Sequence, residues 1–528
     1  MAVIFVSLAD ILALVALLWI VNFYMRVDGA APAWLPSLLA NKQSPLLIGF
    51  FLVLFTIKNL LAYWIHRRQD IFSADVAIRL SEVSLCRFQE GSFGAYINTD
   101  SSAMIRKIAL DPFDFAQQVI SGLQQLITQI SLILVATVAI VLFNAKIFLL
   151  LLAVLLPAAV LVFMLIRRKM ILTREKLRKD NERSYKTLLD ALKGFVESNI
   201  YGKNGFFRKR FMDERRKFGA HLYLSISLQQ LPSRIVEIFA MIGLFLLVLF
   251  ANLNGSSNNG LLLIIGAFLA AAYKIIPGIV KIINLGSQLK AYPIETNEWR
   301  AENPLPLQAG TPIRIDSIEL KEISFEYAGR SLFAPVSLKV GAGELVGIQG
   351  ISGKGKTTLL NLLLGFLSPT DGTILINGEK LEAKEIRKYW PGIAYVKQQS
   401  FLISDSIATN ITLEEETVKA ASTWNFAIQQ SGLDQLLSQF PGHASSLIAE
   451  NGKNISGGQQ QRISLARAFY RNASLILLDE PFNELDREST GTILNALKAM
   501  AESGKLIILV THDQEILSSC TKTIRIGE

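Results

Sequence analysis

The chain has 528 residues, of which 51% are hydrophobic and 18% are charged. This composition argues against a soluble protein, and nearly all the apolar surplus lies before residue 285. The net charge of +9 does not indicate nucleic-acid binding, because lysine and arginine concentrate in two segments between apolar runs. The two cysteines are too few for a disulfide framework.

Apolar stretches dominate the first half of the chain, and each is close to the ~20 residues that a membrane-spanning helix needs. The first begins at Met1 without a basic lead-in, which suggests that no cytoplasmic leader precedes it. It is too long for a signal-peptide core and has no convincing cleavage site, so we interpret it as a span. We therefore predict an all-α transmembrane domain over 1–300 with six spans, at about 1–25, 46–66, 119–143, 147–166, 233–252 and 260–285.

Basic residues set the orientation of these spans. They cluster after the second span, at His66-Arg67-Arg68, and after the fourth, from Arg167-Arg168-Lys169 to Arg215–Lys217. Basic connections lie on the cytoplasmic side of a membrane. Both connections are long and have a helical pattern, so the turns at 89–94 and 198–202 are candidates for contact with a cytoplasmic domain; the alternative is a solvated basic hairpin.

The composition changes after about residue 290. A proline-bearing linker is predicted over 301–312, between Asn303-Pro304 and Gly310-Thr311-Pro312. From 313 to 528, short apolar strands alternate with helices, which is typical of an α/β fold with a parallel sheet.

A glycine-rich loop in this second region matches G-x-x-x-x-G-K-[ST], whose backbone N–H groups surround nucleotide phosphates. An apolar strand is predicted before it, over 344–348, and a helix after it, over 358–364. This order points the N-terminus of the helix at a bound phosphate. We therefore predict that the phosphates are bound by Gly350, Ser352, Gly353, Lys354, Gly355, Lys356, Thr357 and Thr358.

A later apolar strand, 475–479, ends in the acidic pair Asp479 and Glu480. The carboxyl ends of buried parallel strands are where α/β proteins bind ligands. We predict that Asp479 holds Mg²⁺ through water and that the Thr357 hydroxyl is a further ligand. Glu480 would then orient or deprotonate the attacking water.

Residues 455–459 read Ile-Ser-Gly-Gly-Gln and precede Gln460-Gln461-Arg462. With the two preceding motifs, this segment resembles the LSGGQ signature of ATP-binding cassette (ABC) proteins, and the resemblance covers 313–528. It implies an ATPase that uses ATP and Mg²⁺. It also implies that the signature, at a helix N-terminus, binds the γ-phosphate held by an opposite cassette, through Ser456, Gly457, Gly458 and Gln459.

Four further positions match the family pattern. Tyr327 resembles the aromatic residue that stacks on adenine, and Gln398 resembles the glutamine that contacts Mg²⁺ and the attacking water. Asp486 resembles the aspartate that bridges two cassettes. His512 resembles the switch histidine that reads the γ-phosphate. The resemblance thus implies that Gln398 and His512 are catalytic residues beside Glu480.

Two segments depart from the usual exporter pattern. The chain has Asp-Glu-Pro-Phe-Asn-Glu-Leu-Asp at 479–486 and Thr-His-Asp at 511–513, where exporters usually show D-E-A-T-S-A-L-D and A-H-R. These variants resemble importer cassettes, but the fusion of long helices to a cassette resembles an exporter. Since one chain carries one cassette, a complete site needs two chains. A homodimer in the cytoplasmic membrane, with its cassettes in the cytoplasm, is the simplest assembly; a heteromeric partner is the alternative.

Ionisable residues inside spans are costly and are candidates for function. Two of them, Lys274 and Lys281, lie two turns apart on the last predicted span. A positive stripe facing a cavity would suit a phosphate or pyrophosphate headgroup, whereas both lysines would be solvated if this span has already left the bilayer. The other candidates are Asp10, Lys58, Arg234 and Glu237.

Segments 231–237 and 272–277 resemble bacterial lipid-linked oligosaccharide flippases. This resemblance implies a flippase or exporter of a lipid-linked or amphipathic substrate, with membrane lipids as partners. An exporter of small peptides is an alternative, although many such proteins begin with a protease domain, which we do not expect here. An exporter of hydrophobic drugs is a second alternative, and a cassette-regulated channel or sensor is a third, from another class.

Overall fold

The structure is a computed structural model, which describes residues 2–25, 45–91, 93–143, 145–253, 275–286, 288–289, 312–327, 330–351, 353–414 and 421–526. The chain forms two compact units, which we describe separately. The first comprises Met1–Gly91 and Thr99–Pro304, and the second comprises Ser92–Asn98 and Leu305–Glu528. The second unit therefore takes up a short segment from within the helical half of the sequence.

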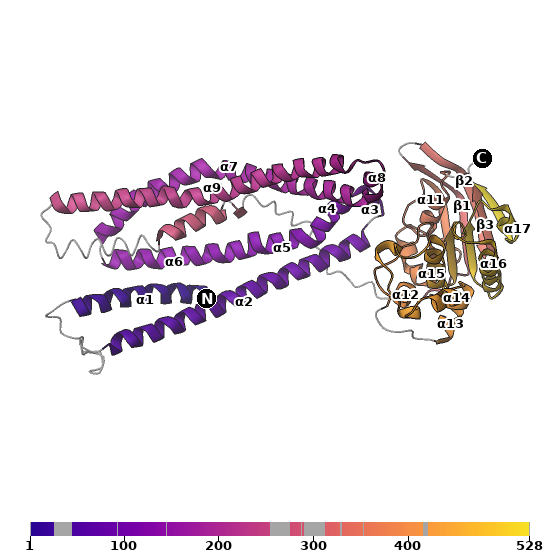
Figure 1. Ribbon diagram of the computed structural model, residues 1–528, viewed down its shortest axis with the longest axis horizontal. Helices are drawn as coiled ribbons and strands as arrows, with labels where there is room; N and C mark the ends of the chain where they lie inside the picture. The colour runs from indigo at the N-terminus through magenta and orange to yellow at the C-terminus, as the bar shows by residue number, and fades with distance from the viewer. Residues whose placement is uncertain are drawn as a thin grey trace. The chain divides into compact units, whose positions relative to one another are not determined.

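Long helices make up the described part of the first unit (Figure 1). Three of them contain 45 to 50 residues, and at 1.5 Å per residue each extends about 70 Å, more than twice the ~30 Å of a bilayer's hydrocarbon core. These helices are long enough to cross a membrane and continue beyond it. The main helices are α1 (Ala2–Met25), α2 (Leu46–Glu90), α6 (Ser121–Phe143), α7 (Ala145–Lys193) and α9 (Asn204–Leu253).

Shorter helices connect the long ones. Between α2 and α6, two single π-helical turns, Arg106–Leu110 and Ala116–Ile120, alternate with α4 and α5 (Ser101–Ile105 and Asp111–Phe115). The six-residue α8 (Phe195–Ile200) joins α7 to α9. A last apolar helix covers Ile275–Gly286.

The predicted spans fall on these helices as far as the structure describes them. Two helical stretches, Leu46–Glu90 and Ser101–Val138, are long and apolar enough to cross a membrane, and Leu8–Leu17 and Ile275–Gly286 are shorter apolar stretches. Most of the sixth predicted span, 260–285, lies outside the described residues. The count of six spans therefore stays a prediction, whereas the helical character of the region is confirmed.

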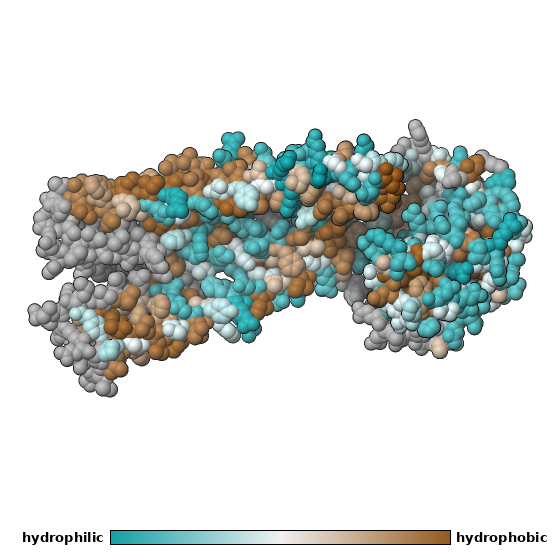
Figure 2. All heavy atoms as spheres, in the orientation of Figure 1, coloured by the Kyte–Doolittle hydropathy of each residue, from teal (hydrophilic) through white to brown (hydrophobic). Residues whose placement is uncertain are grey.

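Apolar packing holds the helices of the first unit together. Val162, Ile166 and Met170 of α7 are buried in one cluster with Leu228 and Val236 of α9. Many other large apolar side chains on the helices are exposed, as Figure 2 shows along this unit. Extensive apolar exposure is expected of helices that face lipid or other helices rather than water.

The described residues of the second unit form two sheets. An antiparallel sheet has the order β2-β1-β4-β5, and a parallel sheet has the order β6-β7-β8-β3-β9. The predicted α/β fold with a parallel sheet is therefore confirmed. The strands are β1 (Ser317–Tyr327), β2 (Arg330–Gly341), β3 (Leu345–Gly350), β4 (Asp371–Ile376), β5 (Glu379–Leu381), β6 (Ile393–Val396), β7 (Leu475–Asp479), β8 (Leu506–Val510) and β9 (Lys522–Ile526).

The central parallel strands are apolar because both their faces are covered. All five residues of β7 and all five of β8 are buried. Hydrogen bonding pairs β7 with β8 and β8 with β3, so the ends of β3 and β7 lie two strands apart at one edge of the sheet. The helices of this unit are α3 (Phe93–Asn98), α11 (Lys356–Leu363), α12 (Ile407–Thr412), α13 (Ala421–Gln430), α14 (Asp434–Gln439), α15 (Gly457–Tyr470), α16 (Arg487–Glu502) and α17 (Gln514–Ser518).

Candidate nucleotide-binding site

The glycine-rich loop joins β3 to α11, as the motif requires. Gly355 immediately precedes α11 and has a φ of 87°, a conformation that favours glycine. A Cβ atom there would lie 2.6 Å from Cδ1 of Phe333, so the site also lacks room for a side chain. Lys356 is buried, and its Nζ donates a hydrogen bond of 2.9 Å to the carbonyl oxygen of Gly350 across the loop.

The other predicted phosphate-binding residues belong to the same loop and to the start of α11. Gly353 has a φ of 80°, Lys354 is exposed, and Thr358 is half-buried in the first turn of the helix. Ser352 lies outside the described residues. Backbone N–H groups at the start of α11 have no intrahelical partner, so this end of the helix suits an anion.

The structure brings together two of the three residues predicted to hold a metal, Thr357 and Asp479. Thr357 Oγ1 donates a 2.7 Å hydrogen bond to Oδ2 of Asp479, which is only 2% exposed. Burial raises the pKa of Asp479, partly opposed by the hydrogen bond from Thr357. One carboxylate and one hydroxyl are the hard oxygen donors that Mg²⁺ takes beside nucleotide phosphates, so these residues fit that ion.

Glu480 is the point at which three parts of the chain converge. Its Oε1 lies 3.5 Å from Nζ of Lys356. Its Oε2 accepts hydrogen bonds from Nε2 of Gln398 at 3.0 Å and from Nδ2 of Asn483 at 2.7 Å. The two predicted catalytic residues Gln398 and Glu480 are thus in direct contact.

The backbone of Glu480 is unusual. Its φ is 50°, in the left-handed region that non-glycine residues rarely adopt, and its N–H donates to the carbonyl of Val510 at 3.0 Å. Such backbone strain clusters at functional sites, where the surrounding structure enforces it. Asn483 is not among the residues predicted from the sequence, although its place in a turn three residues after Glu480 could have indicated a contact with that residue.

Two predicted residues lie at strand ends. Asp479 pairs with Val510 in the sheet, and His512 follows Val510 by two residues and is exposed. Tyr327 is the last residue of β1 and is 63% exposed. Both side chains are accessible to a ligand; their proposed contacts with nucleotide stay predictions.

The signature segment forms a helix cap. Ser456 is the N-cap of α15: its hydroxyl accepts from the N–H of Gln459, while its own N–H donates to Oε1 of Gln459 at 2.9 Å. This capping box gives Gln459 a structural task within its own cassette. A Cβ atom on Gly457 would meet Oε2 of Glu484 at 2.7 Å, and one on Gly458 would meet the Glu484 carbonyl at 2.6 Å. The two glycines therefore allow the turn after Glu480 to lie against the signature.

Asp486 caps the next helix. Its carboxylate accepts a hydrogen bond of 2.9 Å from the N–H of Ser489 and lies 3.2 Å from Nη2 of Arg462, on the signature helix. The hydrogen bonds from the backbone and hydroxyl of Ser489, with a smaller effect of Arg462, lower the pKa of Asp486 to about 2. The predicted bridging residue is thus already held inside its own cassette.

A short helix from the first half of the sequence belongs to the cassette unit. In α3, the ring of Phe93 stacks on Phe366 with centroids 5.0 Å apart, and Phe366 lies 5.4 Å from Trp390. Phe93, within the turn predicted at 89–94, therefore contacts the cassette, whereas the cytoplasmic location of that cassette stays a prediction. The second predicted turn, 198–202, includes the end of α8, whose large side chains Phe195, Val196 and Ile200 are exposed.

The charged residues predicted inside spans have different environments. Lys58 of α2 forms an ion pair with Asp10 of α1, so these two charges neutralise each other between neighbouring helices. Arg234 and Glu237 form an exposed pair 3.3 Å apart on α9, and Lys281 is exposed. Lys274 lies outside the described residues.

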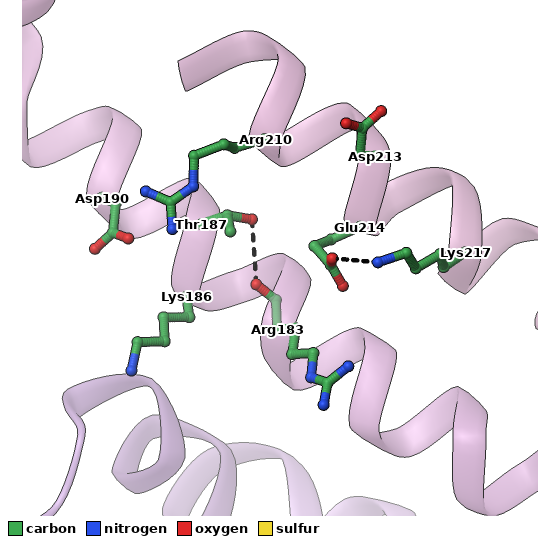
Figure 3. Close-up of a pocket in the computed structure, with 8 residues that line it drawn as sticks. All are labelled: Arg183, Lys186, Thr187, Asp190, Arg210, Asp213, Glu214 and Lys217. Atoms are coloured by element: carbon green, nitrogen blue, oxygen red, sulfur yellow. Dashed lines mark hydrogen bonds and ion pairs between the residues drawn. The ribbon is translucent and has the colours of Figure 1, made fainter. Parts of the chain in front are cut away.

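A polar groove of about 370 Å³ lies between segments of α7 and α9 that are outside the predicted spans (Figure 3). Four basic and three acidic side chains line it, and several are paired: Lys217 with Glu214 at 2.6 Å, and Lys186 with Asp100 at 2.7 Å. These paired charges are what a helix surface in water carries. The groove therefore supports the prediction that the basic connections lie outside the bilayer. The lining residues are Arg183, Lys186, Thr187, Asp190, Arg210, Asp213, Glu214 and Lys217.

Comparisons with known proteins agree with this site. Residues 333–483 match the model of the ABC transporter family. A probable ABC transporter ATP-binding/permease protein of Haemophilus influenzae is 29% identical over 374 residues, which cover 66% of each chain. An ATP-dependent lipid A-core flippase of Burkholderia orbicola is 29% identical over 372 residues, covering 69% of this chain and 62% of the flippase. The chain therefore spans slightly less than two thirds of the length of these relatives.

The fold also matches that of a solved exporter. The structure of a bacterial Atm1-family ABC exporter with ATP bound is similar with a TM-score of 0.77, over 100% of this chain and 93% of that one, at 19% identity. This likeness shows the fold alone. Together with the converging nucleotide site, the matches show an ABC transporter cassette over residues 333–483, in a chain that shares the fold of this exporter and joins apolar helices to the cassette.

Proposed function

We propose that two copies of this chain form an ATP-driven exporter or flippase that moves a lipid-linked or amphipathic substrate across the cytoplasmic membrane. The convergence of Lys356 and Gln398 on Glu480, beside the Thr357–Asp479 pair, carries the proposal. This set can bind a nucleotide's phosphates, hold a metal ion and activate water at one edge of a sheet.

The nucleotide chemistry assigns a task to each group. The loop from Gly350 to Thr357 binds the phosphates. When ATP enters, Lys356 leaves the carboxylate of Glu480 and binds phosphate oxygens instead. Thr357 and Asp479 would hold Mg²⁺, which neutralises charge on the phosphates. Glu480 accepts a proton from the attacking water, and Gln398 orients that water. His512, which follows the neighbouring strand β8, contacts the γ-phosphate.

The signature completes the site of a second copy. The N–H groups at the start of α15 form a positive helix end, and its glycines expose the backbone there. A phosphate held by the loop of one chain would thus meet Ser456 and Gly457 of the other. Asp486 supports that contact by fixing Arg462 behind the signature.

Exposed apolar residues on α8 support the same assembly. Phe195, Val196 and Ile200 project from a six-residue helix that is otherwise bounded by polar segments. Since α3 already stacks on the cassette of its own chain, we propose that α8 covers its apolar side chains on the cassette of the second copy. ATP-driven closure of the cassettes would then move the helices of both chains.

The substrate is proposed from two observations of different kinds. Relatives that match most of this chain are named ATP-dependent lipid A-core flippases. Within the chain, Lys281 places an exposed positive charge on the last apolar helix of the first unit, which would suit a phosphorylated headgroup. Export of small peptides or hydrophobic drugs is the alternative.

Purified protein in liposomes tests the proposal. ATPase rates should rise with lipids that carry phosphorylated headgroups, and Lys281→Gln combined with Lys274→Gln should remove this stimulation but leave the basal rate unchanged. Stimulation by peptides or hydrophobic cations alone would instead favour the alternatives. ATP-loaded vesicles should accumulate substrate against a gradient; an ion conductance without such accumulation would indicate a cassette-regulated channel.

Assembly is tested separately. Cysteines introduced at Ile351 and Lys453, which are exposed beside the phosphate loop and the signature, should cross-link between chains in the presence of ATP and of Glu480→Gln, which slows hydrolysis. Cross-links restricted to a single chain, or none at all in a variant that binds ATP, would contradict the dimer.

A further inference from the structure

We propose that Asn483 is a positioning residue that fixes the carboxylate of Glu480 for attack on ATP. The inference rests on the proposed ATPase function and adds a residue to it. Asn483 Nδ2 donates to Glu480 Oε2 at 2.7 Å, the shortest of the three contacts that the structure gives this carboxylate among the described residues.

The other two donors have further tasks in the proposed reaction. Lys356 belongs to the phosphate loop, and Gln398 follows β6 and is assigned to the attacking water. When ATP and water bind, both donors must turn toward these ligands. Asn483 has no competing task, so its amide remains on Oε2 and leaves Oε1 directed at the water.

The turn that carries Asn483 is anchored on both sides. Phe482 is buried in the core of the cassette, and its carbonyl accepts a 3.0 Å hydrogen bond from the N–H of Leu485. Asp486, one residue later, caps α16. On the other side, the N–H of Glu480 is tied to Val510. The donor and the acceptor are therefore both held before substrate arrives, which is the condition for efficient positioning.

This position also distinguishes the chain within its family pattern. Exporters usually have serine where Asn483 stands, and a serine hydroxyl reaches one bond less far than an asparagine amide. Glu480 has a left-handed backbone, and its side chain lies against the turn, where Oε2 accepts the hydrogen bond from Asn483. We infer that the longer asparagine side chain reaches the Glu480 carboxylate in this geometry, and that a serine at this position would form a weaker hydrogen bond to it.

Substitution of Asn483 tests the inference in the full-length protein in liposomes. Asn483→Ala should lower kcat about 10- to 100-fold, as expected for a lost hydrogen bond to a charged group, and change KM for ATP less than about twofold. Asn483→Ser should recover part of the rate. Asn483→Asp, which has the same shape but repels Glu480, should be slower than alanine. Asn425→Ala, on the exposed face of α13, is the matched control and should hydrolyse ATP at the wild-type rate.

A double-mutant cycle separates positioning from structure. If Asn483 acts through Glu480, adding Asn483→Ala to Glu480→Gln should leave the residual rate unchanged, whereas independent effects would multiply. Equal rates for the alanine, serine and aspartate variants, or a loss confined to KM, would overturn the inference. So would a fall in folded fraction, followed by tryptophan fluorescence, that accounts for the whole loss of rate. Failure of the wild-type protein to hydrolyse ATP would instead contradict the proposed function itself.

Discussion

The hydroxyl of Thr357 and the carboxylate of Asp479 are joined by a 2.7 Å hydrogen bond, although 122 residues separate them in sequence. The bond links the first turn of α11 to the end of β7. It places two of the side-chain oxygens predicted as metal ligands within reach of one ion, next to the phosphate loop.

Thr357→Val should weaken the response to Mg²⁺, because it keeps the shape of threonine and removes the hydroxyl ligand. We expect the Mg²⁺ concentration for half-maximal ATPase to rise about tenfold or more, in line with the loss of one of the few protein ligands of the ion. Thr357→Ser retains the hydroxyl and is the control. An unchanged Mg²⁺ titration for valine would remove Thr357 from the metal site.

Glu480→Gln should abolish turnover while ATP still binds. The amide cannot accept the proton, and removal of a general base costs on the order of 100- to 10,000-fold in rate. Lys356, relieved of a carboxylate 3.5 Å away, remains available for phosphate. ATPase assays and binding of a fluorescent ATP analogue measure the two parts; near-normal hydrolysis would exclude Glu480 as the base.

Ser456 has two roles that substitutions can separate. Ser456→Ala removes the N-cap of α15 and should cost about 1 kcal/mol of cassette stability as well as activity. Ser456→Asn keeps a good N-cap, so it should restore the unfolding temperature but leave the ATPase impaired if the hydroxyl meets the γ-phosphate of a second copy. If the asparagine variant recovers both the unfolding temperature and the ATPase rate, Ser456 acts only as the N-cap of α15.

Phe93→Ala should uncouple ATP hydrolysis from transport. It removes the ring that stacks on Phe366 at 5.0 Å and thereby loosens α3 from the cassette. We expect substrate-stimulated ATPase and uptake into vesicles to fall severalfold, with ATP binding intact. Ile97→Ala, an exposed residue on the same helix, is the control. Normal transport by Phe93→Ala would show that this stacking is dispensable.

Cys520 should react slowly with thiol reagents at neutral pH. Burial raises the pKa of its thiol to about 11, so at pH 8 only about one thousandth is the reactive thiolate. Labelling by a maleimide in a Cys86→Ser background should therefore speed up about tenfold per pH unit up to pH 10. It should also become fast after unfolding in denaturant. Rapid labelling of the folded protein at pH 7 would contradict the burial.

The sequence predicted the local structure around the nucleotide motifs well. A phosphate loop needs glycines at fixed offsets before a helix, and Gly353 and Gly355 indeed have positive φ. Apolar runs ending in Asp479 likewise predicted a buried parallel strand. Neither prediction depends on distant partners. The partners of charged residues in the predicted spans could not be predicted in this way. Lys58 and Asp10 form an ion pair between two helices, and their positions in the sequence do not indicate that pair.

By itself, then, the sequence determined the division into apolar helices and an α/β cassette, together with the positions of the phosphate loop and of the signature, because periodicity and motif spacing are properties of contiguous residues. Tertiary structure alone decided that Gln398 and Asn483 share one oxygen of Glu480, and that Phe93 packs into the cassette. Such contacts depend on how strands order in a sheet and on how a turn is anchored. Strand order and the anchoring of the turn are determined by the burial of apolar residues over the whole domain, because the free energy of packing distant segments exceeds any local preference.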